Sequence, residues 1–194
     1  MQKKQEQDAL TIERICKSFG DTQVLFDITL DFHIGEVHAL VGENGAGKST
    51  VGKIIGGYYS RDKGDISVFN QKIDSWSPKQ ALSYGIAMIH QELSLVPELT
   101  VGENIYLGIE SNRSGILRRD EKERFDELDA LCGFGLNPNA KVSSLRIADQ
   151  QKIEIMRALS RDARVIIMDE PTSSLTADET DRLHEVIAWL KKSG

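Results

Sequence analysis

Apolar and polar residues alternate along the first part of the chain in a pattern that predicts β-strands. Residues 1–9 are mostly polar, so we expect them to be disordered. Leu10, Ile12 and Ile15 then have the spacing of a first strand. Over residues 28–32 every second residue is apolar, which is typical of a half-exposed strand. The chain therefore begins with β structure.

The next apolar runs predict further strands and a first helix. Residues 37–41 are almost all apolar and are expected to form a buried strand. A glycine-rich stretch, residues 42–47, separates this run from residues 48–56, whose apolar positions have helical spacing. Residues 66–73 predict a short antiparallel ribbon, and residues 86–89 predict another buried strand.

The pattern changes between residues 93 and 139, where helical spacing replaces alternation. The charged stretch of residues 120–128 is expected to be helical, since Phe125, Leu128 and Leu131 then share one face. We therefore expect mostly helical structure in this part of the chain.

The last part of the chain alternates helix and strand. Residues 150–160 predict a helix, and the continuous apolar run of residues 165–168 is typical of a buried strand in a parallel sheet. Thr176 and Glu179 have the spacing of a capping box that opens a last helix. The core face of that helix is expected to carry Leu183, Val186, Ile187 and Leu190.

Together these elements predict an α/β fold with a partly parallel sheet and a small antiparallel portion. The core is expected to consist of residues 10–75 and 144–194, interrupted by a helical subdomain over about residues 76–143. In an alternating scheme a last helix normally leads into another parallel strand. We therefore expect the C-terminal end of this single domain to be incomplete.

The composition and charge of the chain exclude several classes of function. The chain of 194 residues has 24 Lys and Arg against 30 Asp and Glu, a formal charge of −6, which argues against nucleic-acid binding. No apolar run approaches the roughly 18 residues of a membrane span, and no signal peptide is evident. Cys16 and Cys132 lie far apart without a CxxC motif, so we expect neither a disulfide framework nor a zinc site, and a cytoplasmic location.

The glycine-rich loop carries the strongest chemical signal. Residues 42–49 match G-x-x-x-x-G-K-[ST] between a predicted strand and a predicted helix. Such glycines let backbone N–H groups surround a β-phosphate at the positive end of the helix. Lys48 is expected to reach the β- and γ-phosphate oxygens and Ser49 to ligate Mg²⁺. A plain tight turn is the alternative, although a turn needs no Lys and Ser directly after it. The predicted binding residues are Gly42, Glu43, Asn44, Gly45, Ala46, Gly47, Lys48, Ser49 and Thr50.

Two carboxylates follow the apolar run of residues 165–168. We expect Asp169 to lie beside the phosphate loop and hold Mg²⁺, and Glu170 to act as the general base that aligns or deprotonates a water. Taken alone, the pair could also be an acidic cap of the strand, and its place beside a phosphate loop argues against that alternative. Gln91, just after residues 86–89, is expected to contact Mg²⁺ or the attacking water through its amide and to begin a movable loop.

These motifs resemble the nucleotide-binding domain of ATP-binding-cassette (ABC) transporters, from about Leu10 to the end of the chain. Residues 41–50 look like the family's Walker A motif, Gln91 like its Q-loop glutamine, residues 166–172 like its Walker B motif and residues 173–176 like its D-loop. The resemblance therefore implies a P-loop NTPase fold of the ABC type with ATP and Mg²⁺ as ligands.

More local similarities refine the resemblance. Phe19 falls where the family has an aromatic residue that stacks on adenine, with a core phenylalanine as the alternative. Residues 35–44 and 90–97 are most similar to the ATPases of bacterial monosaccharide (ribose/galactose/xylose-type) importers, in which two cassettes commonly occur in tandem. The chain resembles the N-terminal cassette of such a protein.

The chain departs from the family pattern at two places. Where the family has LSGGQ, residues 145–149 read Leu-Arg-Ile-Ala-Asp, so that Arg146 replaces a small hydroxyl donor. Arg146 either disables one composite site or, as the alternative, approaches phosphate as an arginine finger. The family's switch histidine follows the next strand, beyond residue 194, and His184 on the last helix is no substitute.

The resemblance implies that the protein binds MgATP and hydrolyses it together with a second cassette, powering sugar import through separate membrane permease subunits. Residues 92–104 would lie against the permease, and a periplasmic or extracellular sugar-binding protein would be an indirect partner. The expected location is the cytoplasmic face of the cell membrane, peripherally bound, with no nucleic-acid partner. The alternatives are a soluble ABC-type ATPase that acts on ribosomes or nucleic acid, and a nucleotide-binding remnant without turnover.

Overall fold

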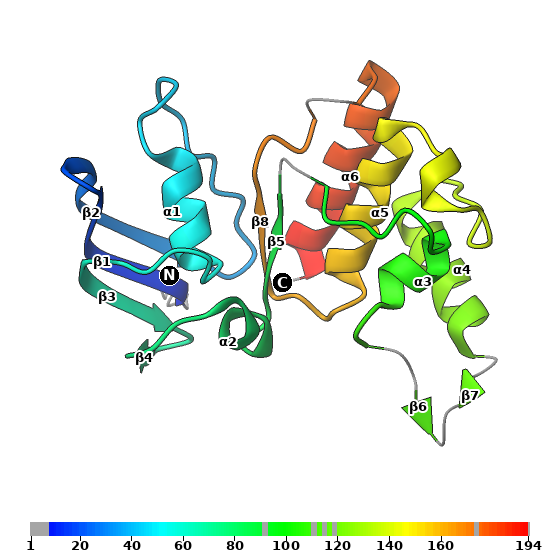
Figure 1. Ribbon diagram of the computed structural model, residues 1–194, viewed down its shortest axis with the longest axis horizontal. Helices are drawn as coiled ribbons and strands as arrows, with labels where there is room; N and C mark the ends of the chain where they lie inside the picture. The colour runs from blue at the N-terminus through cyan, green and yellow to red at the C-terminus, as the bar shows by residue number, and fades with distance from the viewer. Residues whose placement is uncertain are drawn as a thin grey trace, which may run out of the picture. The chain divides into compact units, whose positions relative to one another are not determined.

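A computed structural model describes residues 8–90, 93–109, 112–113, 116–117, 120–172 and 175–193 of the chain (Figure 1). By their internal contacts the residues form two compact units. The first extends to Met88 and takes in the C-terminal residues from Trp189 on, and the second is Ile89–Ala188. The elements are, in order, β1 (Asp8–Phe19), β2 (Thr22–His33), α1 (Lys48–Ile55), β3 (Lys63–Val68), β4 (Gln71–Ile73), α2 (Pro78–Ser83), β5 (Ile86–Ile89), α3 (Val101–Tyr106), β6 (Asn112–Arg113), β7 (Ile116–Leu117), α4 (Asp120–Cys132), the 3₁₀ helix η1 (Val142–Ser144), α5 (Ile147–Leu159), β8 (Val165–Met168) and α6 (Ala177–Ser193).

The first unit is built on an antiparallel sheet with the strand order β2-β1-β3-β4. Leu10 lies opposite Phe32 on one side and Val68 on the other, and Ile12 is paired in the same way with Leu30 and Ile66. The apolar side chains at alternate positions of β1 and β3 are almost completely buried. The first strand, the half-exposed second strand and the antiparallel ribbon are therefore confirmed. Strand β1 begins at Asp8 and Ala9 is buried, so the expectation that residues 8 and 9 are disordered is wrong.

Residues 37–41 form no strand, so the expectation of a buried strand there is wrong. Val41 is 92% exposed, and Val37 and Leu40 are also exposed. An apolar run becomes a strand only where a neighbouring strand satisfies its backbone groups. Within the described part of the chain, no strand of the three sheets includes or pairs with this run. The helix expected after the glycine-rich loop is confirmed as α1.

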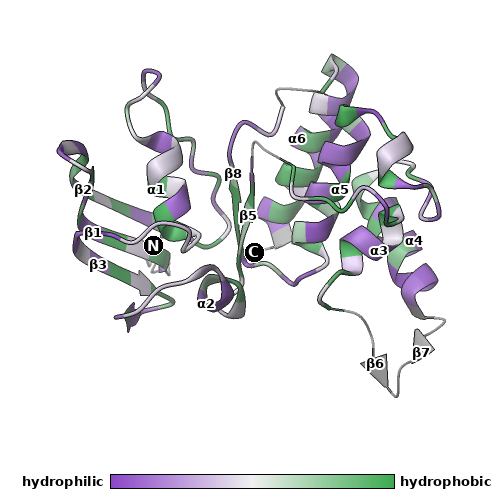
Figure 2. Ribbon diagram, in the orientation of Figure 1, coloured by the Kyte–Doolittle hydropathy of each residue, from purple (hydrophilic) through white to green (hydrophobic). Residues whose placement is uncertain are grey.

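The second unit is mainly helical, with α3 and α4 packed against α5. Figure 2 shows polar and apolar residues alternating along α5 and α6, as amphipathic helices require. Ile153 and Met156 of α5 are fully buried, as is Leu183 of α6. The expected helices near residues 120, 150 and 177 are therefore confirmed, although α5 begins three residues before the predicted Gln150.

Strand β8 pairs with β5 in a two-stranded sheet. The backbone N–H of Asp169 donates to the carbonyl of Ile89 at 3.1 Å, which continues the pairing to the end of both strands. All four β8 residues are half-buried, so the expectation of a fully buried strand is wrong. A run of apolar residues indicates that a strand can be buried. Whether both faces of the strand are buried depends on which other elements pack against them. The subdomain boundaries near residues 76 and 143 stay a prediction.

None of the helices formed by the described residues is both long enough and apolar enough to cross a lipid bilayer.

Candidate nucleotide-binding site

The glycine-rich loop of the first unit forms a tight turn that ends at the N-terminus of α1. Gly45 and Gly47 have φ angles of 83° and 89°, in the left-handed region that favours glycine. A Cβ atom at Gly47 would lie 2.6 Å from Cδ2 of the buried Leu25, so only glycine fits without displacement. Of the predicted binding residues, the loop contains Gly42, Glu43, Asn44, Gly45, Ala46 and Gly47, while Lys48, Ser49 and Thr50 open α1.

The Lys48 side chain folds back over this loop. Its Nζ donates hydrogen bonds to the carbonyl oxygens of Gly42 at 2.9 Å and Glu43 at 2.8 Å. The N–H of Ala46 donates to the same Glu43 carbonyl at 3.1 Å, which closes the turn. The lysine ammonium is therefore held at the loop itself.

The start of α1 is suited to an anion. Gly47, at the N-cap position, offers no side chain to the first N–H groups, and the first turn contains no acidic residue. The positive end of the helix dipole and the initial N–H groups thus lie next to the Lys48 ammonium. Because the loop from Val41 to Ala46 is exposed, a phosphate group can reach them.

The oxygen donors of the predicted site fit magnesium bound together with phosphates. Mg²⁺ usually takes one or two protein oxygen ligands and completes its shell with water and phosphate oxygens. Ser49, in the first turn of α1, and the carboxylate of Asp169 are donors of this kind. Among the residues that the structure describes, no group of three or more His, Cys, Asp and Glu could hold a metal by itself.

Phe19 ends β1 and is 44% exposed, so it is not a core residue. Its ring packs edge-on against Tyr59, with the ring centroids 5.3 Å apart and the planes at 73°. The Lys17 ammonium lies 5.4 Å from the Phe19 centroid and pairs with Asp62 at 3.0 Å. The hydrogen bond from Lys17 lowers the pKa of Asp62. Phe19 is thus a held, accessible aromatic ring, and its stacking on adenine stays a prediction.

Asp169 and Glu170 belong to the second unit and follow β8 directly. Glu170 is exposed and has a φ of 51°, a conformation that costs a non-glycine residue about 1–2 kcal/mol. Five other non-glycine residues in the described ranges have a similar positive φ, so this conformation does not by itself mark a functional site. Lys48 and Ser49 belong to the first unit, so their joint action with this pair on one nucleotide stays a prediction.

Two of the predicted motifs extend outside the described residues. Gln91, the expected contact to Mg²⁺ or water, lies outside them, as do residues 173 and 174 of the expected D-loop.

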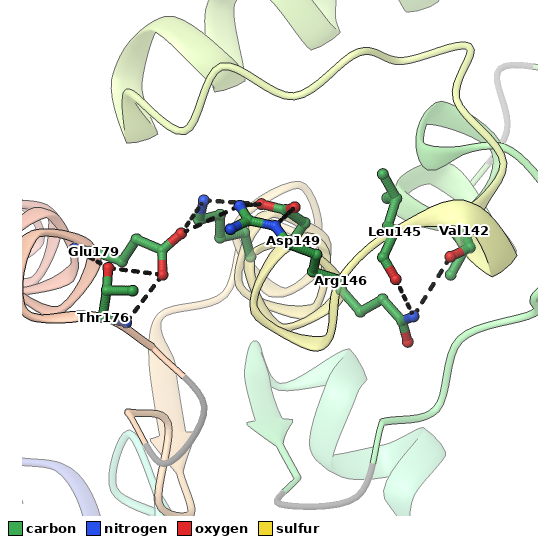
Figure 3. Close-up of polar contacts among 8 residues, drawn as sticks. Val142, Leu145, Arg146, Asp149, Thr176 and Glu179 are labelled. Atoms are coloured by element: carbon green, nitrogen blue, oxygen red, sulfur yellow. Dashed lines mark hydrogen bonds and ion pairs between the residues drawn. The ribbon is translucent and has the colours of Figure 1, made fainter.

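Residues 145–149, which differ from the family's LSGGQ pattern, begin at the turn between η1 and α5. Arg146 is the N-cap residue of α5, and the Gln150 amide donates to the carbonyls of Leu145 at 3.1 Å and Val142 at 3.4 Å (Figure 3). The guanidinium Nε of Arg146 pairs with Oδ2 of Asp149 at 3.1 Å. The turn is thereby fixed on one side by backbone carbonyls and on the other by an ion pair.

Sequence reasoning missed the role of Lys152, which bonds both Asp149 and Glu179. Residues 146, 149 and 152 recur every three positions, a spacing that places them along one face of α5 and could have signalled the cluster. Glu179 was expected only as a capping residue. Its capping box with Thr176 is confirmed, with hydrogen bonds of 3.0 Å from the Thr176 backbone N–H and from its hydroxyl.

Residues 25–173 match the ABC transporter family, and the chain therefore belongs to that family. This confirms the resemblance drawn from the motifs.

Among its relatives, the chain is 46% identical over 187 residues to the ribose import ATP-binding protein RbsA of Chromobacterium violaceum, covering 95% of this chain. It is 49% identical over 190 residues to a putative ribose/galactose/methyl galactoside import ATP-binding protein of Agrobacterium fabrum, again over 95%. The chain spans 37% of the length of each of these relatives. The likeness to monosaccharide import ATPases is thereby confirmed.

Among solved structures, the chain is similar to the ADP conformation of MJ1267, an ATP-binding cassette of an ABC transporter. The TM-score is 0.82 at 25% identity, with 96% of this chain and 78% of the other covered. The predicted fold class, an α/β P-loop NTPase of the ABC type, is confirmed.

Proposed function

We propose that this chain is an ATP-binding cassette that binds MgATP and, paired with a second cassette, hydrolyses it. The observation that carries the proposal is the Lys48 ammonium bonded across its own loop at the uncapped start of α1. Three sources of positive potential meet there: the ammonium, the first N–H groups and the helix dipole. Such an arrangement binds phosphate groups, and a nucleoside triphosphate is the ligand class that we propose.

Each predicted residue has a distinct task in this proposal. Lys48 exchanges its two carbonyl acceptors for β- and γ-phosphate oxygens, which are better acceptors because they are charged. Ser49 and Asp169 hold Mg²⁺, which neutralises phosphate charge when it is bound. Gln91 contacts the metal or the water, and Phe19 stacks on the adenine ring.

Glu170 acts on the water. As a general base it orients one water in line with the γ-phosphorus and accepts the proton that the water loses. Its exposed position just after β8 supports this role. General-base catalysis of this kind contributes about 10²–10⁴-fold in rate.

At the level of the whole protein, we propose that hydrolysis powers import of a monosaccharide. The support is the similarity to ribose and galactose import ATP-binding proteins over 95% of the chain. In this proposal the protein acts at the cytoplasmic face of the membrane, bound to permease subunits through about residues 92–104, with a sugar-binding protein as indirect partner. The relatives are more than twice as long as the aligned segment, which leaves room for a second cassette in tandem. The same similarities favour this function over a soluble ATPase that acts on ribosomes or nucleic acid.

In this proposal each composite ATP site is formed by the phosphate loop of one cassette and the segment at the LSGGQ position of the cassette that faces it. In the site that this chain's residues 145–149 would face, Arg146 occupies the place of a small hydroxyl donor. We propose that this site is disabled rather than completed by an arginine finger, because a bulky guanidinium takes the place of the small donor. Turnover of Arg146→Ser in the assembled transporter separates the two: an increase excludes the finger, and a loss supports it.

The proposed function is tested by uptake and hydrolysis together. Cells that lack the native gene would be complemented with the full natural chain, with Lys48→Ala, or with Lys72→Ala as a control. Lys72 forms an exposed pair with Asp65 at 3.0 Å in the same unit, and the loss of such a pair costs little. We expect uptake of labelled ribose or galactose, and ATP hydrolysis in membranes, to fall to background only in Lys48→Ala. Hydrolysis without uptake of any monosaccharide would contradict the import function, and hydrolysis unaffected by Lys48→Ala would contradict the ATP site.

A further inference from the structure

Four charged side chains join the starts of α5 and α6 in the second unit (Figure 3). The Lys152 Nζ lies 3.0 Å from Oδ1 of Asp149 and 2.8 Å from Oε1 of Glu179. Arg146 pairs with the same two carboxylates, at 3.1 Å to Asp149 and at 3.9 Å to Glu179. Two cations thus balance two carboxylates, and the charge of Arg146 is compensated within its own chain.

The two cations differ sharply in burial. The Lys152 side chain is 9% exposed and the two carboxylate side chains are 15% and 16% exposed, whereas that of Arg146 is 73% exposed. An exposed pair contributes about 0–1 kcal/mol, because water screens it. A buried ammonium, in contrast, must keep its partners, since a buried unpaired charge costs several kcal/mol. Lys152 must therefore keep its two carboxylate partners, whereas the exposed Arg146 guanidinium can exchange them for water at little cost.

Glu179 both caps the start of α6 and pairs with Lys152. Its Oε2 accepts hydrogen bonds from the backbone N–H and the hydroxyl of Thr176, which caps α6, while its Oε1 binds Lys152. The hydrogen bond from Lys152, followed by those from Thr176, lowers the pKa of Glu179 to about 2. Burial alone would lower the pKa of Lys152, but its hydrogen bonds to Glu179 and Asp149 outweigh burial and raise that pKa. The Lys152–Glu179 pair is therefore charged throughout the physiological pH range.

The pair connects two segments that the proposed function places at the nucleotide. Asp149 lies in the first turn of α5, directly after the turn of Leu145 and Arg146. Glu179 lies in the first turn of α6, and Thr176 follows Glu170 by only six residues. Through Lys152, the turn that would face a second cassette and the segment after the proposed general base share one rigid connection.

We propose that Lys152 is a positioning residue for ATP hydrolysis, one that fixes the turn at Leu145 and Arg146 relative to the start of α6. The proposal rests on the proposed ATPase function. Lys152 touches neither nucleotide nor water in it, and it acts only through Asp149 and Glu179. Loss of the connection lets the two segments shift separately, and a misplacement of about 1 Å at a catalytic site can cost on the order of 100-fold in rate. Nucleotide binding at the phosphate loop of the first unit does not depend on Lys152.

The test compares kcat and KM for ATP in the full natural chain with its partners. Lys152→Met keeps the length and apolar stem but removes the charge, and Lys152→Arg keeps the charge. We expect Lys152→Met to lower kcat at least tenfold with KM for ATP and ATP affinity unchanged within twofold, and Lys152→Arg to restore at least half of kcat. Arg182→Gln is the matched control, because it removes an exposed pair with Glu185 at 2.8 Å on α6, the helix that carries Glu179. Its kcat should equal that of the wild type.

A second variant keeps the test decisive where Lys152→Met does not fold. Glu179→Gln keeps one carbonyl oxygen, which can still accept from Thr176, but it replaces the oxygen that accepts from Lys152 with an NH₂ donor and removes the charge. We expect a smaller fall in kcat, about threefold to tenfold, again at constant KM. The inference is overturned if folded Lys152→Met or Glu179→Gln has wild-type kcat, or if KM rises while kcat stays unchanged. Absence of hydrolysis by the wild type, or hydrolysis that survives Lys48→Ala, is a different result, because it removes the proposed function itself.

Discussion

Replacing Gly47 with alanine should destabilise the protein by two separable effects. Gly47 has a φ of 89°, where an L-residue costs about 1–2 kcal/mol. Its new Cβ would also lie 2.6 Å from Cδ2 of Leu25, which is 1% exposed and cannot move away freely. Forcing an extra carbon into such packing costs about 1–3 kcal/mol. We therefore expect Gly47→Ala to lower the free energy of unfolding by about 2–5 kcal/mol.

Gly45→Ala provides the matched control for the backbone effect alone. Gly45 has a similar φ of 83°, but a Cβ there would meet nothing within 4 Å in the described part of the chain. We expect this variant to lose only about 1–2 kcal/mol. Urea denaturation of the two variants then isolates the contact with Leu25 as the difference between their unfolding free energies.

A double variant tests the contact directly. Leu25→Ala alone should cost about 2–5 kcal/mol, since it leaves a cavity. Because it also removes the obstructing Cδ2 atom, Leu25→Ala with Gly47→Ala should cost about 1–3 kcal/mol less than the two single losses combined. Equal losses in Gly45→Ala and Gly47→Ala, or strict additivity with Leu25→Ala, would refute the steric argument for glycine at this position.

Three further predictions concern single side chains. Glu170→Gln should bind ATP normally but turn it over at least about 100-fold more slowly, in single-turnover assays; turnover within fivefold of wild type excludes Glu170 as the base. Phe19→Ala should weaken ATP about 2–10-fold in equilibrium titrations while inorganic tripolyphosphate binds as before; equal losses for both ligands would argue against stacking. Glu179 has a pKa lowered from 4.5 to about 2, so the stability it contributes is full above pH of about 4.5 and is lost as the pH falls through 2. Melting temperatures between pH 5 and pH 2.5 should therefore fall less steeply in Glu179→Gln than in the wild type, and parallel curves would be the contrary result.

Features that depend on local sequence could be predicted. The turn at Gly42–Gly47 requires left-handed glycines, and the lysine and serine after it have fixed places on the first turn of α1. The capping box of Thr176 and Glu179 is likewise set by a spacing of three residues. Strands β1 and β3 are recognisable because side chains alternate between the two faces of a sheet.

Features that depend on contacts between distant segments could not be predicted. Residues 37–41 have the composition of a buried strand, but a strand also needs a neighbouring strand to pair with. The composition of the run does not show whether such a neighbour is present. The short helix α3 was missed although Thr100 and Glu103 form a capping box, because so short a helix has too few residues to show a period. The link from Lys152 to Glu179 joins two helices, and helical spacing along α5 indicates only that Arg146, Asp149 and Lys152 share a face.

Calorimetric titration of the full natural chain with MgATP tests the central claim most directly, because it measures nucleotide binding without requiring a second cassette or a permease. Wild-type protein and Lys72→Ala should bind one MgATP per cassette with equal affinity. Lys48→Ala should bind at least about 100-fold more weakly, since it loses the ammonium that contacts the β- and γ-phosphates. Equal affinity in Lys48→Ala and the wild type would contradict the assignment of this loop as the nucleotide site.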